Sequence, residues 1–303
     1  MTTPAAHRVA ADDQGTRLRL GEVRRVVSLV PSLTEAVAAT APGLLVGATD
    51  WCTHPAELDV VRIGGTKNPD TARIAALRPD LVIANEEENR AADLAALRSL
   101  GLPVWVTEIR TLDQALGSLE RLLTIACGLP SPPWLERAGA AWRALPEPAG
   151  PPRRAVVPIW RRPWMVLGRD TFAGDLLRRL GVEHLHAGHP ERYPAIPIGE
   201  LLAAGPELVV LSDEPYRFAA DDGPEAFPGV PAALVSGRHL TWYGPSLAEA
   251  PAVLAAQLAA RLSTQPAAAG PAQPAGHRTG PGHHRRSTPD GPPDTPCRSG
   301  RPS

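Results

Sequence analysis

The stretch that decides the fold runs from residue 78 to residue 108 and reads RPDLVIANEEENRAADLAALRSLGLPVWVTE. An apolar run at 81–85 is followed by acidic residues and then by a helical pattern over 90–100, which a glycine and a proline end. A second apolar run follows at 104–108. Nearly continuous apolar strands that alternate with helices are typical of a parallel sheet covered on both faces. The stretch therefore predicts a strand–helix–strand unit of an α/β fold.

The same alternation extends towards the N-terminus. Apolar runs at 25–30 and 44–49 predict two further strands, and TEAVAAT between them predicts a helix with Ser32 as its N-cap. The segment TARIAAL, residues 71–77, predicts another short helix. Together these elements predict an N-terminal α/β lobe over residues 24–110.

A second alternating set follows a proline-rich segment and predicts a C-terminal α/β lobe over residues 151–262. Its strand patterns lie at 155–160, 164–168, 208–212 and 239–244, and its helix patterns at 171–180, 198–205 and 246–262. RPDLVIANEEEN and GPELVVLSDEPY occupy similar places in the two lobes, each with acidic residues at the carboxyl end of a strand. Ligands of open α/β sheets bind beyond those ends, so two lobes that face each other predict a cleft.

The remaining segments connect or flank the lobes. Residues 111–150 have helical spacing and predict a linker helix, interrupted by prolines at 130–133. Residues 1–23 are polar and aperiodic, which predicts a flexible N-terminus. Residues 263–303 have no large apolar side chain and cannot offset their ordering entropy by burial, which predicts a disordered tail.

Composition excludes several classes of protein. The chain of 303 residues is 43% hydrophobic, enough to bury a sizeable core, and its net charge of −1 argues against a nucleic-acid partner. No run approaches the ~18 apolar residues of a membrane helix, so no integral membrane segment is expected. The N-terminal sequence lacks an apolar secretory region, which predicts a cytoplasmic protein; a periplasmic or extracellular location is the alternative if the start site is wrongly assigned.

Catalytic motifs are missing from the sequence. There is no G-x-S-x-G, no dinucleotide-binding glycine pattern and no Ser-His-Asp order that the fold supports. We therefore expect a protein that is not an enzyme, with no catalytic residue and no covalently held cofactor.

Seven motifs together carry a resemblance to a known family. VVSLVPSLTE, TDWCTHP, IGGTKNPD and ALRPDLVIANEEENR occur in this order, followed by IWRRPWM, PERYP and SDEPYRF. The ordered set, over about residues 24–262, resembles the Fe³⁺-siderophore- and cobalamin-binding proteins of ABC importers, which are periplasmic-binding-protein-like helical-backbone metal receptors, and is closest to the cobalamin-binding members. The resemblance implies the class III substrate-binding-protein fold, in which one long helical segment joins two Rossmann-like α/β lobes with parallel sheets. It implies that the cleft captures a small-molecule metal chelate. Cobalamin or another corrinoid is the first candidate ligand, and haem or a ferric siderophore is the next.

The chain departs from the transport members at the expected docking point. The resemblance implies an acidic residue in the helix after NPD for docking an importer, and TARIAAL has none. An ABC transporter permease is thus a candidate partner, but the acidic residue with which the first lobe of this chain would dock to it is missing. The alternative is a cytoplasmic metal-cluster or cofactor assembly protein, or an enzyme, on the same scaffold, with Cys52 as a metal ligand.

The loop WCTHP supplies two candidate ligand-binding residues in the first lobe. The resemblance places this loop at the cleft, and we expect Trp51 to stack on the ligand and His54 to be an axial ligand of a bound metal centre. A protein zinc site needs four ligands, and no paired spacing supplies them. In the alternative interpretation Trp51 packs against the protein and Cys52 is a small buried hydrophobe.

Two more stretches of the first lobe contain polar candidates. Lys67 lies in the glycine turn IGGTKNPD, which could cradle an anion by its backbone N–H groups or be a tight turn before a helix. Asn85, Glu87 and Asn89 follow a strand and are candidates for polar contacts to the ligand. Acidic residues at that position also favour the dipole of the next helix.

The second lobe supplies the remaining candidates. The first three are Trp160, Arg161 and Trp164. Aromatic and arginine side chains suit a flat ligand that bears carboxylates or amides, although one of the two tryptophans could instead pack in the core. We expect four more residues to line the cleft: Tyr193, Glu214, Tyr216 and Trp242. The histidines at 184, 186 and 189 are more typical of a solvated surface, so no metal site within the protein is expected.

Overall fold

The computed structural model describes residues 8–148 and 150–260, which fall within one compact unit. The disordered tail expected at 263–303 and the first seven residues of the expected flexible N-terminus lie outside the described residues. Within the described part, two separate parallel sheets form two α/β lobes, as the alternating pattern predicts.

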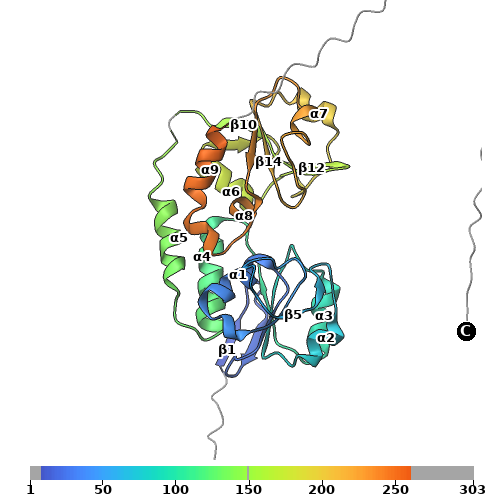
Figure 1. Ribbon diagram of the computed structural model, residues 1–303, viewed down its shortest axis with the longest axis vertical. Helices are drawn as coiled ribbons and strands as arrows, with labels where there is room; N and C mark the ends of the chain where they lie inside the picture. The colour runs from blue at the N-terminus through green and yellow to red at the C-terminus, as the bar shows by residue number, and fades with distance from the viewer. Residues whose placement is uncertain (1–7, 149, 261–303) are drawn as a thin grey trace, which may run out of the picture. The chain divides into compact units, whose positions relative to one another are not determined.

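The first lobe contains a five-stranded parallel sheet in the order β5-β4-β3-β8-β9. Its strands are β3 (Val26–Ser28), β4 (Leu45–Ala48), β5 (Val61–Arg62), β8 (Leu81–Asn85) and β9 (Val104–Thr107). Its helices are α1 (Pro31–Thr40), η1 (Pro42–Leu44), α2 (Thr71–Ala76) and α3 (Ala91–Ser99). Figure 1 shows α1 on one side of the sheet and α2 and α3 on the other. The stretch 78–108 is thus the predicted strand–helix–strand unit, β8–α3–β9.

The second lobe contains a four-stranded parallel sheet in the order β13-β10-β14-β15. Its strands are β10 (Arg153–Val156), β13 (Val182–His184), β14 (Leu208–Ser212) and β15 (Ala232–Val235). Its helical segments are α6 (Phe172–Arg179), α7 (Ile198–Ala203), η3 (Pro224–Ala226), α8 (Gly237–Thr241), η4 (Pro245–Ala248) and α9 (Ala250–Ala259).

A short antiparallel pair accompanies each of these sheets. In the first lobe, β6 (Gly64–Gly65) pairs with β7 (Asn68–Pro69), so the turn IGGTKNPD is a tight hairpin ahead of α2. In the second lobe, β11 (Pro158–Arg161) pairs with β12 (Trp164–Val166). The strand predicted at 155–160 is therefore two strands, β10 and β11, which belong to different sheets.

One strand prediction in the second lobe is wrong. HLTWYG, 239–244, has the aromatic and β-branched residues of a strand, but its first part is the end of α8. Leu240 is buried on that helix, and the Trp242 Nε1 donates a hydrogen bond to Glu214 Oε2 (2.8 Å). Such tertiary contacts outweigh the small preference of these residue types for a strand.

The linker contains two helices, separated at the prolines where the sequence predicts an interruption. α4 (Leu112–Arg121) continues as a π-helical turn, η2 (Leu122–Ala126), and α5 (Pro133–Arg143) follows after a break. The break contains Gly128 at φ +73° and the predicted prolines, which cannot continue a helix. α5 connects the lobes: the Trp134 Nε1 donates to Thr40 Oγ1 on α1, and the Trp142 Nε1 donates to the Leu247 carbonyl on η4, both at 3.0 Å.

The N-terminal segment is also more regular than expected. β1 (Arg8–Ala11) and β2 (Arg17–Leu20) form an antiparallel hairpin, so the expectation of a flexible segment is wrong for residues 8–20. The pattern RLRL has the period of two that places Leu18 and Leu20 on the buried face. The Arg8 guanidinium fixes the hairpin to the end of η2 by donating to the carbonyls of Ile125 and Ala126, both at 2.7 Å.

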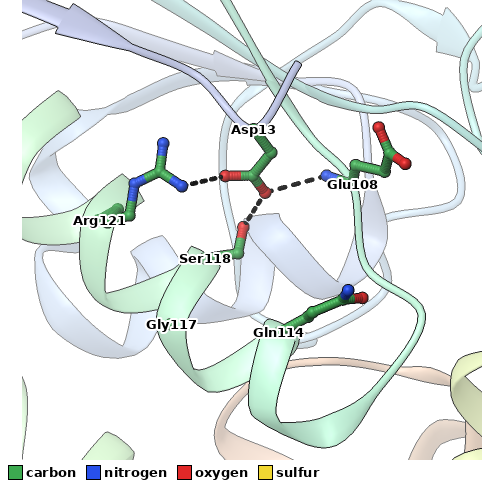
Figure 2. Close-up of a pocket in the computed structure, with 6 residues that line it drawn as sticks. All are labelled: Asp13, Glu108, Gln114, Gly117, Ser118 and Arg121. Atoms are coloured by element: carbon green, nitrogen blue, oxygen red, sulfur yellow. Dashed lines mark hydrogen bonds and ion pairs between the residues drawn. The ribbon is translucent and has the colours of Figure 1, made fainter. Parts of the chain in front are cut away.

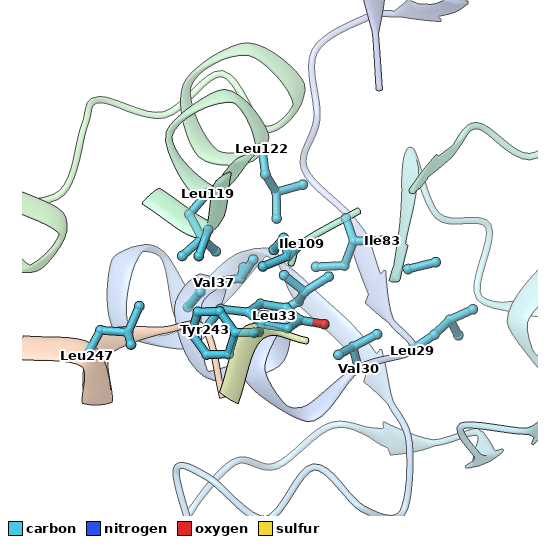
Figure 3. Packing of buried hydrophobic residues seen from close by; sticks show 14 of the residues in the cluster. Leu29, Val30, Leu33, Val37, Ile83, Ile109, Leu119, Leu122, Tyr243 and Leu247 are labelled. Carbon is cyan, nitrogen blue, oxygen red and sulfur yellow. The ribbon is translucent and has the colours of Figure 1, made fainter. Parts of the chain in front are cut away.

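The main hydrophobic core extends across both lobes and the linker. Figure 3 shows Leu33 of α1 and Leu119 of α4 packed together with Tyr243 and Leu247 of the second lobe. A smaller cluster around Phe218 and Phe227 lies within the second lobe. Because the two lobes and the linker share one core, the structure joins them by packing as well as by the chain itself.

Candidate functional site

The loop after β8 is held by two buried asparagines. The Asn85 side chain donates to the Thr107 carbonyl and hydroxyl, both at 3.1 Å, and its Oδ1 accepts the N–H groups of Glu87 and Glu88. The Asn89 Oδ1 accepts the Asn85 N–H, and its Nδ2 donates to the carbonyls of Leu29 and Thr66. Both predicted ligand contacts therefore use their amides to shape the loop that carries the glutamates.

Glu87 connects the first lobe to the second. Its carboxylate accepts hydrogen bonds from Tyr193 OH at 3.1 and 3.2 Å and forms an ion pair with Arg192. The same Arg192 guanidinium lies 3.2 Å from Glu86 Oε2. Lys67, in the hairpin β6–β7, donates to the Glu87 carbonyl. The structure therefore brings together Lys67, Glu87 and Tyr193 of the predicted residues.

A second set of contacts joins the loop WCTHP to the second lobe. The His54 ring lies edge-on to Trp242, with ring centroids 5.4 Å apart and an interplanar angle of 88°. Trp242 is in turn hydrogen-bonded to Glu214. Glu88 interacts electrostatically with Lys67, Glu87 and Glu214, and so lies between the two sets. We call these residues the inter-lobe cluster: His54, Lys67, Glu86, Glu87, Glu88, Arg192, Tyr193, Glu214 and Trp242.

Burial dominates the electrostatics of the cluster carboxylates. Burial raises the pKa of Glu87 above its usual value, although Arg192 and the Tyr193 hydroxyl oppose the shift. Burial also raises the pKa of Glu88 against the pull of Lys67, and that of Glu214 against the Trp242 hydrogen bond. The pKa of Tyr193 is raised by burial and by the nearby Glu87 charge. Burial therefore favours the protonated form of these three carboxyl groups, and their basic and hydrogen-bonding neighbours favour the charged form.

Two predicted tryptophans are largely exposed, one in each lobe. Trp51 has 66% of its surface exposed and lies three residues before His54, beside Gly65 of β6. Trp160 of β11 is 42% exposed and packs edge-on against Tyr216, with centroids 5.5 Å apart. Large aromatic surfaces that face solvent are available to stack on a flat ligand.

Arg161 and Trp164 lie away from the inter-lobe cluster. Trp164 stacks on Phe218 at 6.1 Å and packs edge-on against Phe227. Arg161 forms ion pairs with Asp222 and Glu225, and its guanidinium lies 5.5 Å from the centre of the Trp164 ring. Tyr216, another predicted residue, donates a hydrogen bond to Asp222 Oδ2 (2.7 Å). The three residues therefore hold β11 and β12 against the segment 216–227.

The cysteine of WCTHP is part of the core. Cys52 Sγ lies 3.0 Å from the Thr34 hydroxyl and 3.1 Å from the Thr49 hydroxyl, and burial raises the pKa of its thiol. A protonated, enclosed thiol is a poor metal ligand. His184 is buried, and burial lowers its pKa. Across residues 8–148 and 150–260, no three His, Cys, Asp or Glu side chains are grouped to hold a metal ion.

Two surface hollows lie elsewhere on the described part of the chain. One, of about 370 Å³, is lined by Asp13, Glu108, Gln114, Gly117, Ser118 and Arg121. Figure 2 shows that the Asp13 carboxylate there already bonds to Arg121, Ser118 and the Glu108 N–H. The other lies between β2 and the residues before β9. Neither is lined by the inter-lobe cluster, and in the described structure the predicted cleft residues contact one another instead.

Sequence reasoning missed three members of the cluster: Glu86, Glu88 and Arg192. The glutamates were visible in ANEEENR, but the strand end alone does not say which of three consecutive acids faces the other lobe. Arg192 adjoins the predicted Tyr193 in PERYP, and this adjacency was the available signal.

Among the described residues, no helix has the length and apolar character needed to cross a membrane.

Comparisons with known proteins agree with this architecture. No family model matches the chain. The vitamin B12-binding protein of Pectobacterium carotovorum is 24% identical over 253 residues, which cover 78% of this chain and 89% of that protein. The periplasmic haem-binding protein BhuT, solved with two haems, has a TM-score of 0.66 and 23% identity over 77% of this chain and 97% of that one. The periplasmic vitamin B12-binding protein BtuF of Vibrio cholerae has a TM-score of 0.61 and 19% identity, covering 78% and 97%.

These relatives correct the expected location. The absence of an apolar secretory region predicted a cytoplasmic protein, but BhuT and BtuF are periplasmic and point to the periplasm instead. Sequence similarity and fold together lead to one conclusion. The chain resembles the vitamin B12-binding proteins in sequence and has the two-lobed class III fold of the periplasmic proteins that bind vitamin B12 or haem.

Proposed function

We propose that this protein is a periplasmic binding protein that captures a metal-containing macrocycle between its lobes, with cobalamin or another corrinoid as the first candidate. The observation that carries the proposal is the inter-lobe cluster, where loops of both lobes meet, with the exposed Trp51 three residues before His54. A second exposed tryptophan, Trp160, is supplied by β11 of the second lobe. The vitamin B12-binding relatives support the choice of a corrinoid. Capture of this kind needs binding groups from both lobes and no covalent chemistry.

Each part of the site has a distinct role in this proposal. Trp51 and Trp160 offer flat faces to the macrocycle, as stacking requires. The carboxylates and the Tyr193 hydroxyl offer hydrogen bonds to polar groups at its rim. The His54 Nδ1 lies 3.2 Å from the Thr53 hydroxyl, which orients the ring and favours Nε2 as an axial donor to the metal of the ligand.

Haem is the second candidate ligand. Its support is the fold shared with BhuT, a protein that was solved with two haems. Stacking on the same tryptophans would serve either macrocycle, since both are flat. An importer permease remains a candidate partner; the first-lobe helix α2 contains no acidic residue, and the adjacent Asp70 accepts the Arg73 N–H as its N-cap.

The first experiment is a titration of the full-length protein with aquocobalamin, followed by tryptophan fluorescence and the visible corrin bands. We expect saturable quenching at micromolar ligand or below, and a band shift that is lost in His54→Ala. The double variant Trp51→Ala/Trp160→Ala should weaken binding tenfold or more, because it removes both stacking faces. Trp134→Phe, in the linker, is the matched control and should bind normally. Absence of binding to both aquocobalamin and hemin would reject the proposal.

A further inference from the structure

The two basic side chains of the inter-lobe cluster are both occupied by the protein's own acidic loop. Arg192 forms ion pairs with Glu86 and Glu87, and its side chain is only 19% exposed. Lys67 donates to the Glu87 carbonyl and interacts electrostatically with Glu88. An anionic ligand that entered this region would have to separate these groups before it could bind a cation.

Carboxyl groups outnumber basic side chains in the cluster. Glu86, Glu87, Glu88 and Glu214 lie with Arg192 and Lys67, and Arg238 also acts on Glu214. The carboxylates also repel one another: Glu86 acts on Glu87, and both Glu87 and Glu214 act on Glu88. Because the Arg192 side chain is only 19% exposed, its ion pairs with Glu86 and Glu87 decide whether its charge is available to a ligand between the lobes.

We propose that Glu86 and Glu87 determine the charge of the ligand, since by neutralising Arg192 they exclude a macrocycle with carboxylates at its rim and select one with amides. Corrinoids carry amide side chains, and haem carries two propionates. Amide N–H groups can donate to the remaining lone pairs of the Glu86 and Glu87 carboxylates, whereas a propionate would meet like charge. The inference rests on the proposed function, because it requires the ligand to lie at this cluster.

The loop geometry favours this role over a purely structural one. The Asn85 and Asn89 side chains already fix the backbone of the loop, by bonds within the first lobe. The ion pairs of Glu86 and Glu87 with Arg192 are therefore additional to what holds the loop. Loss of their charge should leave the loop in place and alter the field that the ligand meets.

The test compares two ligands on three proteins. Aquocobalamin and hemin are titrated into the wild-type protein, into Glu86→Gln/Glu87→Gln, and into the control Glu108→Gln/Asp113→Asn. The control removes the same amount of charge from two carboxylates that pair with other arginines, Arg110 and Arg179. Circular dichroism checks that each variant is folded.

We expect the wild-type protein to bind aquocobalamin more tightly than hemin. In the Glu86→Gln/Glu87→Gln variant, the ratio of the affinity for hemin to that for aquocobalamin should rise at least tenfold, mainly because hemin binds more tightly. The gain should disappear when Arg192→Met is added, because the guanidinium that would meet the propionates is then absent. The control should leave the ratio within twofold of the wild-type value.

Three results would overturn the inference: an unchanged ratio, an equal shift in the control, or a hemin gain that survives Arg192→Met. Any of these with normal binding of aquocobalamin by the wild-type protein leaves the proposed function standing. If neither macrocycle binds to the wild-type protein or to the variant, the proposed function fails and the inference fails with it.

Discussion

At the scale of single residues, the ion pair between Glu35 and Arg238 joins α1 to α8. Glu35 is buried, and its Oε2 has no hydrogen-bond partner among the described residues. Arg238 also pairs with Glu249 at 3.4 Å. A buried pair of this kind contributes little net stability, but removal of one partner leaves an uncompensated charge.

We therefore expect Arg238→Met to lower the free energy of unfolding by about 2–3 kcal/mol, since Glu35 then lacks its counter-ion. The double variant Glu35→Leu/Arg238→Met should recover most of that loss. Urea denaturation of Arg238→Met, Glu35→Leu and the double variant measures the coupling energy between the two side chains. A double variant that is no more stable than Arg238→Met would contradict this account.

Glu88 provides a residue-scale test of pH dependence. Burial raises its pKa, so between the usual carboxyl pKa of about 4.3 and the higher folded value the folded state binds more protons than the unfolded state. The contribution of Glu88 to stability consequently falls as the pH rises through this window. We expect Glu88→Gln to be more stable than the wild-type protein at pH 7 but not at pH 4, by thermal denaturation. Glu57→Gln, at an exposed position, should show no such difference.

At the scale of elements, Asp175 fastens α6 to the beginning of α4. Its carboxylate accepts the Leu112 N–H at 3.0 Å and bonds to Arg178 and Arg179. Burial by itself would raise the pKa of Asp175, but these partners hold it below its usual value. A carboxylate at a helix N-terminus also interacts favourably with the helix dipole. One side chain thus secures a contact between the linker and the second lobe.

We expect Asp175→Asn to cost about 1–2 kcal/mol of stability at pH 7, the range for hydrogen bonds to a charged group at a partly screened site. Because the folded pKa is depressed, the stabilisation is present above the unfolded pKa of about 3.9 and is lost as the pH falls through the folded value. The difference from the wild-type protein should therefore vanish in strong acid. Thr111→Ala, which removes the N-cap of α4, should cost about 1 kcal/mol at every pH. A pH-independent loss in Asp175→Asn would refute the electrostatic explanation.

At the scale of the whole described molecule, the shared core couples the lobes. Tyr243 and Leu247 of the second lobe pack with residues of α1 and α4, and α5 is bonded to both lobes at its two ends (Figure 3). Two lobes held in this way resist large rotations, because interiors are close-packed and deform little. Ligand capture is then expected to involve small rearrangements at the inter-lobe cluster.

The shared core predicts one cooperative unfolding transition for both lobes. Calorimetry should give a calorimetric enthalpy equal to the van't Hoff enthalpy. Tyr243→Leu should lower the transition temperature without splitting the transition, since its ring packs against the first lobe and the linker. Phe218→Leu, in the smaller cluster of the second lobe, is the comparison variant. Two separate transitions in the wild-type protein would show that the lobes unfold independently.

Several features follow from the sequence alone. The strand at residues 81–85 is predicted with the bounds of β8, because a continuous apolar run is buried on both faces of a parallel sheet. The prolines at 130–133 predict the break in the linker, because proline cannot donate the next helical hydrogen bond. Fold class and the resemblance to binding proteins of metal chelates are likewise confirmed. Local physical rules are sufficient wherever the signal is a periodic pattern or a residue that the backbone geometry excludes.

Tertiary structure decided what each polar side chain does. Asn85 and Asn89 could equally have faced a ligand, and packing turned their amides to the backbone. Arg192 became part of the site because it reaches Glu87, 105 positions earlier in the chain. HLTWYG contains the end of α8 instead of a strand, with Leu240 buried on that helix and Trp242 bonded to Glu214. A hydrogen bond depends on distance and direction between groups far apart in sequence, so only the folded chain determines which of the available partners meet.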